Sequence, residues 1–325
     1  SMDEGCFMKK ALITTIPFGF YDRTSLNLLH TNAIESTINP FNQKIKESQL
    51  KEMIHDYDYL IAGTEPITES VLKNAEKLAL IARVGVGYNN IDLDYAKSKN
   101  IKITYIPDGP DAAVADLTIG LIYSLLRATH ISNLKLHRGE WQRHIGRRIQ
   151  ECKVGIIGAG KIGFRVATEL EKIGTKSILL CDLEQNTSLT NHPSMKWADI
   201  NEVIKSCDVL TFHLPLTSKT ENLISEKELL MMKKDAVIVN TSRGGIINED
   251  DLYKVLESGH LFGAALDVFR KEPYSGKLID IDRCLLTAHT ASMTIDCRNY
   301  MEIEAVKEVI RHLNGESLKC EIPAI

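Results

Sequence analysis

Three residues in the last quarter of the chain carry side chains that together suit the reduction of a 2-oxo acid. Arg243, Glu272 and His289 lie in the motifs N-T-S-R-G-G, D-V-F-R-K-E-P and L-T-A-H-T-A-S. An arginine grips a carboxylate with a planar fork of donors, and a histidine exchanges a proton near neutral pH. A neighbouring carboxylate would orient the imidazole and raise its pKa. We therefore predict that Arg243 binds the substrate carboxylate and carbonyl, and that His289, assisted by Glu272, donates or accepts the proton.

Each of these residues also has an interpretation without catalysis. Arg243 could be a surface arginine in a turn, Glu272 a solvated side chain in its loop, and His289 a hydrogen-bonded core histidine. Their placement favours chemistry, because Arg243 and His289 each lie just past a predicted strand, near 236–240 and 284–287. In parallel sheets, ligands bind at the carboxyl ends of the strands.

A nucleotide-binding signature lies upstream of these three residues. The apolar run Val154–Ile157 leads into G-A-G-K-I-G, residues 158–163, and a helical pattern follows. Its three glycines would permit a tight turn, the approach of a pyrophosphate, and close packing of helix on strand. Asp182 ends the next apolar run, where a carboxylate would bind the ribose hydroxyls and repel a 2′-phosphate. The pattern predicts NAD rather than NADP; the alternative is a glycine-rich turn with an unrelated aspartate.

Composition indicates an ordinary globular chain. The 325 residues are 44% hydrophobic, enough for two domains with real cores, and the net charge of -4 gives no reason to expect nucleic acid or a membrane as partner. Seven scattered cysteines without a C-x-x-C motif argue against a disulfide framework or a zinc site, so no metal is predicted. The N-terminal residues do not resemble a signal peptide, and no apolar run has the roughly 18 residues of a membrane span. We expect a soluble cytoplasmic protein.

The distribution of apolar residues predicts alternating strands and helices. In the first hundred residues, strands are expected near 11–13, 59–61 and 78–82, and helices near 46–55, 68–76 and 93–99. Residues 111–137 form one long helical pattern, so apolar that we expect it to be central or at a subunit interface.

A second series of strands follows, each but the last leading into a helix. These strands are expected near 153–158, 177–182, 208–212, 236–240, 262–266 and 284–287, and a final amphipathic helix covers 294–313. The pattern predicts an α/β fold with doubly wound parallel sheets.

At this point the residues resemble a known family, the D-isomer-specific 2-hydroxyacid dehydrogenases, which includes D-3-phosphoglycerate, D-lactate and glyoxylate/hydroxypyruvate enzymes. V-G-V-G-Y-N-N-I-D, residues 84–92, resembles the family's substrate loop, whose backbone N–H groups hold the substrate carboxylate. A-V-A-D-L-T, residues 113–118, resembles the start of its dimer-forming helix, and H-L-P-L-T, residues 213–217, resembles the motif beside the nicotinamide. Arg243, Glu272 and His289 fall on the family's catalytic positions.

The resemblance implies a set of contacts. The substrate would be held by Val84, Gly85, Val86, Gly87 and Arg243. The cofactor would be held by Val86, Gly158, Gly160, Lys161, Ile162, Gly163, Asp182, His213, Leu214, Pro215, Thr241, Ser242, Arg243, Asp267 and His289, with Asp267 on the nicotinamide amide.

The resemblance also implies a layout of two Rossmann-like or flavodoxin-like domains. An NAD-binding domain, 108–291, would be inserted into a discontinuous substrate domain, 1–107 and 292–325. The active site would lie in the cleft between them, and the protein would be a homodimer acting on a small-molecule 2-oxo or 2-hydroxy acid.

Some positions depart from the family's pattern. Ala288 replaces the usual proline before the catalytic histidine. Asp116 replaces the usual glutamate at the start of the dimer-forming helix. Vertebrate-type phosphoglycerate enzymes have an arginine near the position of Ala62 that helps to bind the substrate phosphate. The absence of this arginine, with Glu65 nearby, argues against 3-phosphoglycerate as the substrate. The basic cluster Arg143, His144, Arg147 and Arg148 could instead bind a phosphorylated substrate or form a solvated surface.

Two other functions on this scaffold stay open at this stage. Formate enzymes usually carry Gln in place of Glu272 and Ser in place of Thr290, so formate or phosphite oxidation is disfavoured. The other alternative is an NAD-sensing binding protein, similar to the transcriptional corepressors built on this fold. Such proteins can retain all three catalytic-type residues, but we expect no disordered interaction tail here, which favours an enzyme.

Overall fold

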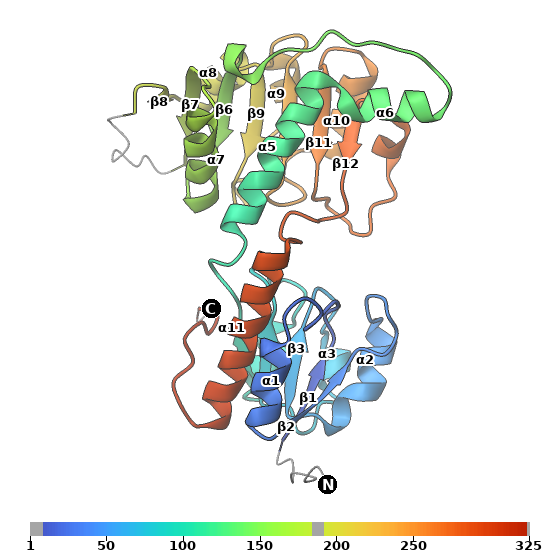
Figure 1. Cartoon of the computed structure of the whole chain (residues 1–325), viewed down its shortest axis with the longest axis vertical. Helices are drawn as coiled ribbons and strands as arrows, with labels where there is room; N and C mark the ends of the chain where they lie inside the picture. The colour runs from blue at the N-terminus through green and yellow to red at the C-terminus, as the bar shows by residue number, and fades with distance from the viewer. Residues whose placement is uncertain (1–8, 184–191, 324–325) are drawn as a thin grey trace. The chain divides into compact units, whose positions relative to one another are not determined.

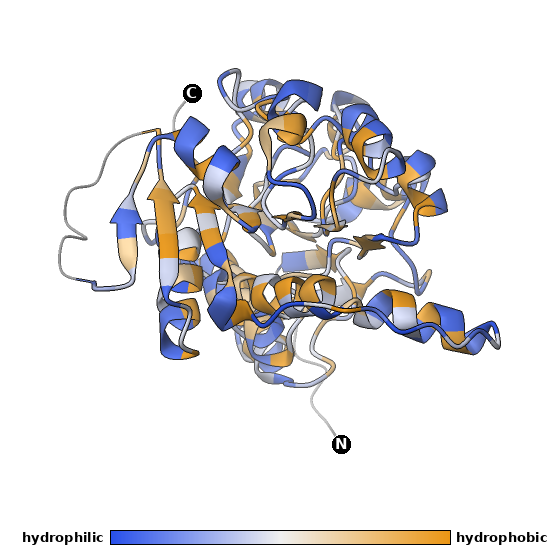
Figure 2. Ribbon diagram, turned by 90° about the horizontal axis from the view of Figure 1, so that it is seen from above, coloured by the Kyte–Doolittle hydropathy of each residue, from blue (hydrophilic) through white to orange (hydrophobic). Residues whose placement is uncertain are grey.

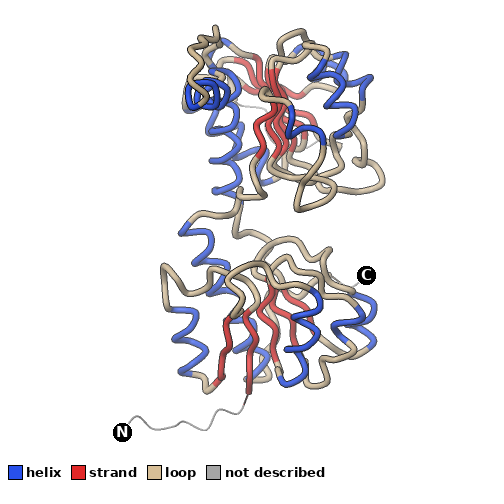
Figure 3. The backbone as a smooth tube through the Cα atoms, turned by 90° about the vertical axis from the view of Figure 1, so that its right-hand side faces the viewer, coloured by secondary structure: helices blue, strands red, loops and turns tan. Residues whose placement is uncertain are grey.

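The computed structural model describes residues 9–183 and 192–323, which form two compact units (Figure 1). Unit 1 comprises Ser1–Pro110 and Met293–Ile325, and unit 2 comprises Asp111–Ser292. Each unit is built on a parallel sheet with helices on both faces (Figure 3). Residues 1–8, which include Cys6, lie outside the described residues.

The sheet of unit 1 has five parallel strands in the order β2-β1-β3-β4-β5, which is the flavodoxin order. The strands are β1 (Lys9–Ile13), β2 (Ile34–Ile38), β3 (Tyr59–Ala62), β4 (Leu80–Arg83) and β5 (Lys102–Thr104). The helices are α1 (Thr24–Thr31), α2 (Glu47–Met53), α3 (Glu69–Leu72), α4 (Leu93–Ser98) and α11 (Ile295–Leu313). The last helix returns to this unit and packs against α1 and β4.

Three elements of unit 1, α1, β2 and β5, were not predicted from the sequence. β2 is an edge strand whose burial pattern does not alternate cleanly, and β5 is only three residues long. Neither offers the sustained apolar run that identified β1, β3 and β4, whose central residues are fully buried.

Unit 2 contains a seven-stranded parallel sheet in the order β12-β11-β10-β9-β6-β7-β8. The strands are β6 (Lys153–Ile157), β7 (Ser177–Cys181), β8 (Met195–Trp197), β9 (Val209–Phe212), β10 (Val237–Asn240), β11 (Gly263–Leu266) and β12 (Cys284–Leu286). The helices are α5 (Asp111–Arg127), α6 (Thr129–His137), α7 (Lys161–Lys172), α8 (Ile200–Ser206), α9 (Glu226–Met231) and α10 (Glu249–Glu257).

The central strands of this sheet are apolar because both of their faces are covered. β9, β10 and β11 are buried at every position, as expected for parallel strands between two helical layers. One hydrophobic cluster lies on each face of the sheet. Figure 2 shows the consequence as largely orange strands beside helices that alternate between orange and blue.

The single long helix expected over 111–137 is wrong. The chain forms α5 and α6, separated by Ala128, whose φ of 51° is left-handed, and the two helices meet at 65°. A left-handed alanine costs about 1–2 kcal/mol. Because neither glycine nor proline marks the break, the apolar pattern continues through it and predicts a single helix. Among the described residues, no single helix is long and apolar enough to cross a membrane, although the bent pair α5 and α6 passes that test together.

A second correction concerns the segment after β11. The expected helix is absent from residues 267–283; a loop and a short 3-10 turn, Lys277–Asp280, occupy this segment. Pro273, in the middle of this segment, cannot donate a helical hydrogen bond. The segment instead carries Glu272 toward the next strand.

Candidate active site

In unit 2, the carboxyl ends of β9, β10 and β11 lie level with one another, so the loops that follow these strands meet at one edge of the sheet. Asn240 at the end of β10 pairs with Phe212 at the end of β9 and with Leu266 at the end of β11. β6 lies beside β9, although β7 and β8 come between them in the sequence. This reversal is the topological switch point, where ligands bind in open α/β sheets.

The glycines of the fingerprint meet the steric demands of a dinucleotide site. A Cβ on Gly158, whose φ is +95°, would lie 2.3 Å from the carbonyl oxygen of His213, and one on Gly163 would lie 1.8 Å from that of Gly158. A Cβ on Gly160 would meet no described atom within 4 Å. Gly158 and Gly163 are therefore required by packing, whereas Gly160 leaves open space in front of α7. The first N–H groups of that helix, from Lys161 and Ile162 onward, suit the phosphates of a dinucleotide.

Asp182 lies against this loop. Its Oδ2 accepts a hydrogen bond from Ala159 N at 2.9 Å, and its Oδ1 accepts one from Leu183 N at 2.7 Å. The carboxylate is thus held beside the glycines, where it was expected to bind the ribose.

The loop after β9 presents His213, Leu214 and Pro215 at the other side of the switch point. His213 Nε2 lies 2.9 Å from the hydroxyl of Thr211. Burial lowers the pKa of His213 to about 3, so the ring is neutral at physiological pH. Leu214 is buried, and the carbonyl oxygen of Pro215 accepts a hydrogen bond from Thr220 Oγ1 at 2.6 Å. The loop is therefore fixed by its own contacts.

Asn240 shapes the loop that carries Thr241, Ser242 and Arg243. Its amide donates to the carbonyl oxygen of Arg243 at 2.9 Å, and its Oδ1 accepts from Ser242 N at 3.0 Å. Thr241 Oγ1 lies 2.8 Å from Thr118 Oγ1 of α5.

This turn leaves the Arg243 side chain exposed. Its Nη1 donates to the carbonyl oxygen of Ser242 at 2.7 Å. Partial desolvation lowers the pKa of Arg243, the Glu272 carboxylate opposes that shift, and the guanidinium stays charged at neutral pH.

Glu272 and His289, 17 residues apart in the chain, are in direct contact. His289 Nδ1 lies 2.8 Å from Glu272 Oε2, and the two side chains are 46% and 35% exposed. The second oxygen of Glu272 accepts a hydrogen bond from Phe269 N at 3.1 Å. One oxygen therefore fixes the glutamate to its loop while the other faces the imidazole.

Asp267 holds the backbone on both sides of His289. Its side chain is 0% exposed, and Oδ1 accepts hydrogen bonds from Thr287 Oγ1 at 2.7 Å and Thr290 N at 2.8 Å. Oδ2 accepts a third from Ala291 N at 3.0 Å. His289 itself has a left-handed φ of 50°, a conformation that needs such support.

This supporting role was not anticipated for Asp267 or for Asn240. The available sequence feature was a polar residue at the end of a buried strand, as Asn240 is in β10, or directly after one, as Asp267 is after β11. The contact of Asp267 with a nicotinamide amide stays a prediction.

The expected substrate loop belongs to unit 1 and follows β4. Val84 and Gly85 are buried, while Val86 and Gly87 are partly exposed. Val84 N donates to the carbonyl oxygen of Ala62, and Ile106 N donates to that of Gly85, both at 2.9 Å. The loop is therefore held between β3 and the segment after β5.

The basic cluster near residue 145 is partly engaged in structural contacts. Arg147 Nη1 lies 3.1 Å from Asp208 Oδ1, and Nη2 donates to the carbonyl oxygen of Asp235 at 2.7 Å. Arg147 thus fastens its segment to the sheet of unit 2. Arg143 and Arg148 are exposed.

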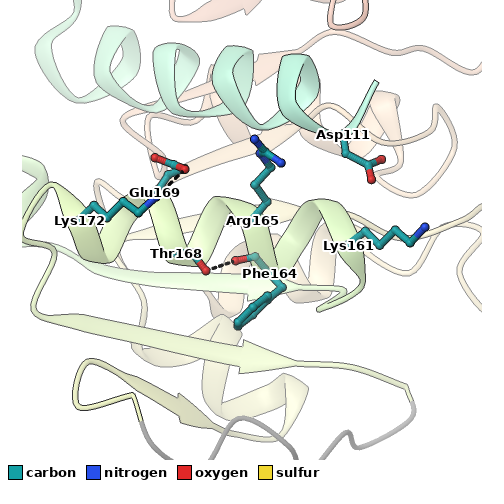
Figure 4. A pocket seen from close by; sticks show the side chains of 7 residues that line it. All are labelled: Asp111, Lys161, Phe164, Arg165, Thr168, Glu169 and Lys172. Atoms are coloured by element: carbon teal, nitrogen blue, oxygen red, sulfur yellow. Dashed lines mark hydrogen bonds and ion pairs between the residues drawn. The ribbon is translucent and has the colours of Figure 1, made fainter. Parts of the chain in front are cut away.

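A separate cavity of about 510 Å³ lies between the start of α5 and the outer face of α7 (Figure 4). It is lined by Asp111, Lys161, Phe164, Arg165, Thr168, Glu169 and Lys172, with the side chain of Arg165 directed toward α5. Lys161 belongs to the fingerprint, but the catalytic candidates do not line this cavity. Over residues 9–183 and 192–323, no group of three or more His, Cys, Asp and Glu side chains could hold a metal ion.

Comparisons with known proteins agree with this geometry. Residues 119–291, more than half of the chain, match the family described as D-isomer specific 2-hydroxyacid dehydrogenase, NAD binding domain. The chain is 35% identical to D-3-phosphoglycerate dehydrogenase of Methanocaldococcus jannaschii over 84% of its own length, but spans only 53% of that relative. It is 30% identical to hydroxypyruvate reductase of Thermotoga maritima, over 84% of this chain and 90% of the relative.

Solved structures extend the likeness to the whole fold. The TT0316 protein of Thermus thermophilus superposes with a TM-score of 0.86, at 26% identity over 97% of this chain and 100% of the other. With the fingerprint that fits a dinucleotide, these matches identify NAD as the cofactor. The chain belongs to the D-isomer specific 2-hydroxyacid dehydrogenase family.

Proposed function

We propose that this protein is an NAD-dependent oxidoreductase that interconverts a D-2-hydroxy acid and the corresponding 2-oxo acid. The observation that carries the proposal is the 2.8 Å contact between His289 Nδ1 and Glu272 Oε2, in the same unit as Arg243 and the dinucleotide fingerprint. A proton-transfer group with an orienting carboxylate is what reduction of a carbonyl requires beside the cofactor. NAD, when bound, supplies or accepts the hydride at C2 of the substrate.

His289 acts as proton donor during reduction and as acceptor in reverse. Because Nδ1 faces Glu272, Nε2 is the ring nitrogen that meets the substrate oxygen. When the ring is protonated, the Glu272 carboxylate stabilises its positive charge. Arg243 binds the substrate carboxylate and the carbonyl oxygen, where negative charge develops during reduction.

The remaining contacts follow from the same assignment. The N–H groups of the loop Val84–Gly87 hold the substrate carboxylate, and the Asp182 carboxylate holds the ribose hydroxyls of NAD. The start of α7 binds the pyrophosphate, and the residues after β9 and β10 border the nicotinamide. Arg147 is a structural residue in this scheme, because its guanidinium already contacts Asp208 and the backbone of Asp235.

A screen of NADH oxidation over a panel of 2-oxo acids tests the proposal. The panel comprises glyoxylate, pyruvate, hydroxypyruvate, phosphohydroxypyruvate and larger sugar-derived 2-oxo acids. We expect saturable turnover of at least one of them, with a KM below about 1 mM for the physiological substrate class. Retained NADH binding with no turnover across the panel would refute the enzyme assignment in favour of an NAD-sensing binding protein.

We further propose that the protein is a homodimer joined through unit 2. α6 and the segment that follows expose three large apolar side chains, Leu136 at 56%, Trp141 at 82% and Ile145 at 97%. These residues lie on a stretch that runs outward from α5 and returns to β6 (Figure 1). Large exposed apolar groups on one segment favour a protein interface, and a second copy of this chain is the partner that symmetry favours.

Light scattering after size exclusion measures this association directly. Wild-type protein is expected near twice the 36.4 kDa of one chain, and the double variant Trp141→Ser/Ile145→Ser near the monomer mass. Leu230→Ser, which changes an apolar side chain that is 50% exposed on α9, is the matched control and should stay dimeric. A monomeric wild type would refute this part of the proposal.

A further inference from the structure

Two buried ionisable side chains, Glu65 and Arg83, lie next to the loop Val84–Gly87 of unit 1. Glu65 is 2% exposed and Arg83 is 6% exposed. Arg83 is the last residue of β4, directly before the loop, and Glu65 follows the neighbouring strand β3. Burying an ionisable side chain is costly unless neighbouring groups compensate for its lost solvation.

Glu65 is fixed by contacts across the carboxyl edge of the sheet. Its Oε1 accepts hydrogen bonds from the hydroxyl of Thr14, at the end of β1, and from Gly63 N at 3.3 Å. A Cβ on Gly63 would lie 3.0 Å from Glu65 Oε2 and 3.1 Å from Cβ of Thr15. Glu65 therefore fills the space that the absent side chain of Gly63 leaves between β1 and β3.

Arg83 contacts the loop itself. Its Nη1 donates to the carbonyl oxygen of Val84 at 2.5 Å. A Cβ on Gly85 would lie 2.8 Å from Nη1 and 3.1 Å from Cζ of the same guanidinium. The guanidinium thus occupies the space that a side chain at position 85 would need, so glycine at this position allows the contact.

Peptide planarity turns this contact into control over the direction of an N–H group. The carbonyl of Val84 and the N–H of Gly85 belong to one peptide plane and point in opposite directions. Arg83 holds that carbonyl, and Ile106 N holds the carbonyl of Gly85 at 2.9 Å. The N–H groups of Gly85 and Val86 are therefore both aimed by contacts on the opposite side of the loop.

The electrostatics of the pair agree with this geometry. Burial raises the pKa of Glu65, and its hydrogen bond from Thr14 and the nearby positive charge of Arg83 oppose that shift. A cation close beneath the loop also makes the potential there favourable for an anion.

We propose that Arg83, together with the neighbouring buried Glu65, is a positioning residue that aims the N–H groups of the loop Val84–Gly87 at the carboxylate of a 2-oxo acid. This inference rests on the proposed function, because it assigns a support to the loop that the proposal places on the substrate. Neither side chain is expected to exchange protons with the substrate. Their removal should therefore weaken substrate binding more than the chemical step.

Glyoxylate is the probe, since this smallest 2-oxo acid offers only its carboxylate and carbonyl for recognition. Arg83→Met should raise the KM for glyoxylate about tenfold or more, as expected for one lost charge-assisted hydrogen bond. The same variant should lower kcat less than threefold and leave the Kd for NADH unchanged. Arg83→Lys keeps the charge and should recover part of the KM. Arg23→Met, at an exposed arginine before α1, is the matched control.

Glu65→Gln tests whether the glutamate acts through the arginine. It should raise the KM for glyoxylate about threefold to tenfold, and the double variant Glu65→Gln/Arg83→Met should be no worse than Arg83→Met alone, because residues acting as one unit are not additive. Glu69→Gln, which alters an exposed ion pair on α3, is its control and should leave KM unchanged.

The possible results distinguish the positioning role of Arg83 and Glu65 from the proposed function of the protein. Wild-type turnover with an unchanged KM in folded Arg83→Met or Glu65→Gln overturns this inference alone. Equal losses in kcat and in NADH affinity also overturn it, because they indicate general damage to the fold. If Arg83→Met does not fold, Arg83→Lys and Glu65→Gln decide by the same criteria. A wild-type protein that reduces no 2-oxo acid of the panel overturns the proposed function, and this inference with it.

Discussion

Replacing Asp267 by asparagine should destabilise unit 2 and misplace His289. The side chain is fully buried, and its two oxygens accept hydrogen bonds from Thr287, Thr290 and Ala291. An asparagine keeps one oxygen, so its amide must face at least one N–H group that then has no acceptor. An unsatisfied buried donor costs about 1–3 kcal/mol, which for a domain of this size corresponds to a fall in Tm of roughly 3–9 °C.

Thermal unfolding, monitored by tryptophan fluorescence, measures the Tm of unit 2, because Trp141 and Trp197 both lie in this unit. Asp280→Asn, at an exposed position of the same segment, is the control and should change stability by less than about 0.5 kcal/mol. We also expect kcat to fall in Asp267→Asn, since the left-handed backbone of His289 loses its support. An unchanged Tm and kcat in this variant would refute the structural role assigned to Asp267.

Two further predictions follow from the same unit. The variant Gly160→Ala should fold with a wild-type Tm but bind NADH at least about tenfold more weakly, because the new methyl group enters open space near the pyrophosphate. The variant Gly163→Ala should fail to fold or have a far lower Tm, since its Cβ would lie 1.8 Å from the carbonyl oxygen of Gly158. Equal Tm values for the two variants in thermal melts would contradict this contrast. Because burial lowers the pKa of His213 to about 3, this residue binds fewer protons in the folded state than in the unfolded state below about pH 6.5. The free energy of unfolding should therefore decrease as the pH is lowered below about 6.5, by up to about 1.4 kcal/mol per pH unit. Urea titrations at pH 7 and pH 5 measure this loss, and His213→Gln should reduce the difference between them; an undiminished difference would place the titrating group elsewhere.

The features of the fold and of the candidate site that were predictable from the sequence depend on local requirements. The fingerprint could be recognised because Gly158 and Gly163 answer steric demands within one strand, turn and helix. The strands β6, β9, β10 and β11 could be recognised because burial on both faces requires continuous apolar runs. The resulting α/β fold with two parallel sheets is confirmed.

The features that were missed depend on tertiary context. The break at Ala128 carries no glycine or proline, and the edge strand β2 lacks a clear pattern of burial. The contacts of Asp267 with Thr287 and Ala291 join residues twenty and twenty-four positions apart, and no periodicity reveals them. The assignments of individual residues to substrate and cofactor, the homodimer and the cytoplasmic location stay predictions.

The turnover number of His289→Gln, measured with NADH and the best 2-oxo acid of the panel, tests the role of His289 as proton donor. Glutamine retains a polar side chain of similar reach but cannot serve as a proton donor near neutral pH. We predict that kcat falls by about 10²- to 10⁴-fold, while the Kd for NADH stays within about twofold of the wild-type value. A kcat within threefold of wild type would contradict the assignment of His289 as the proton donor.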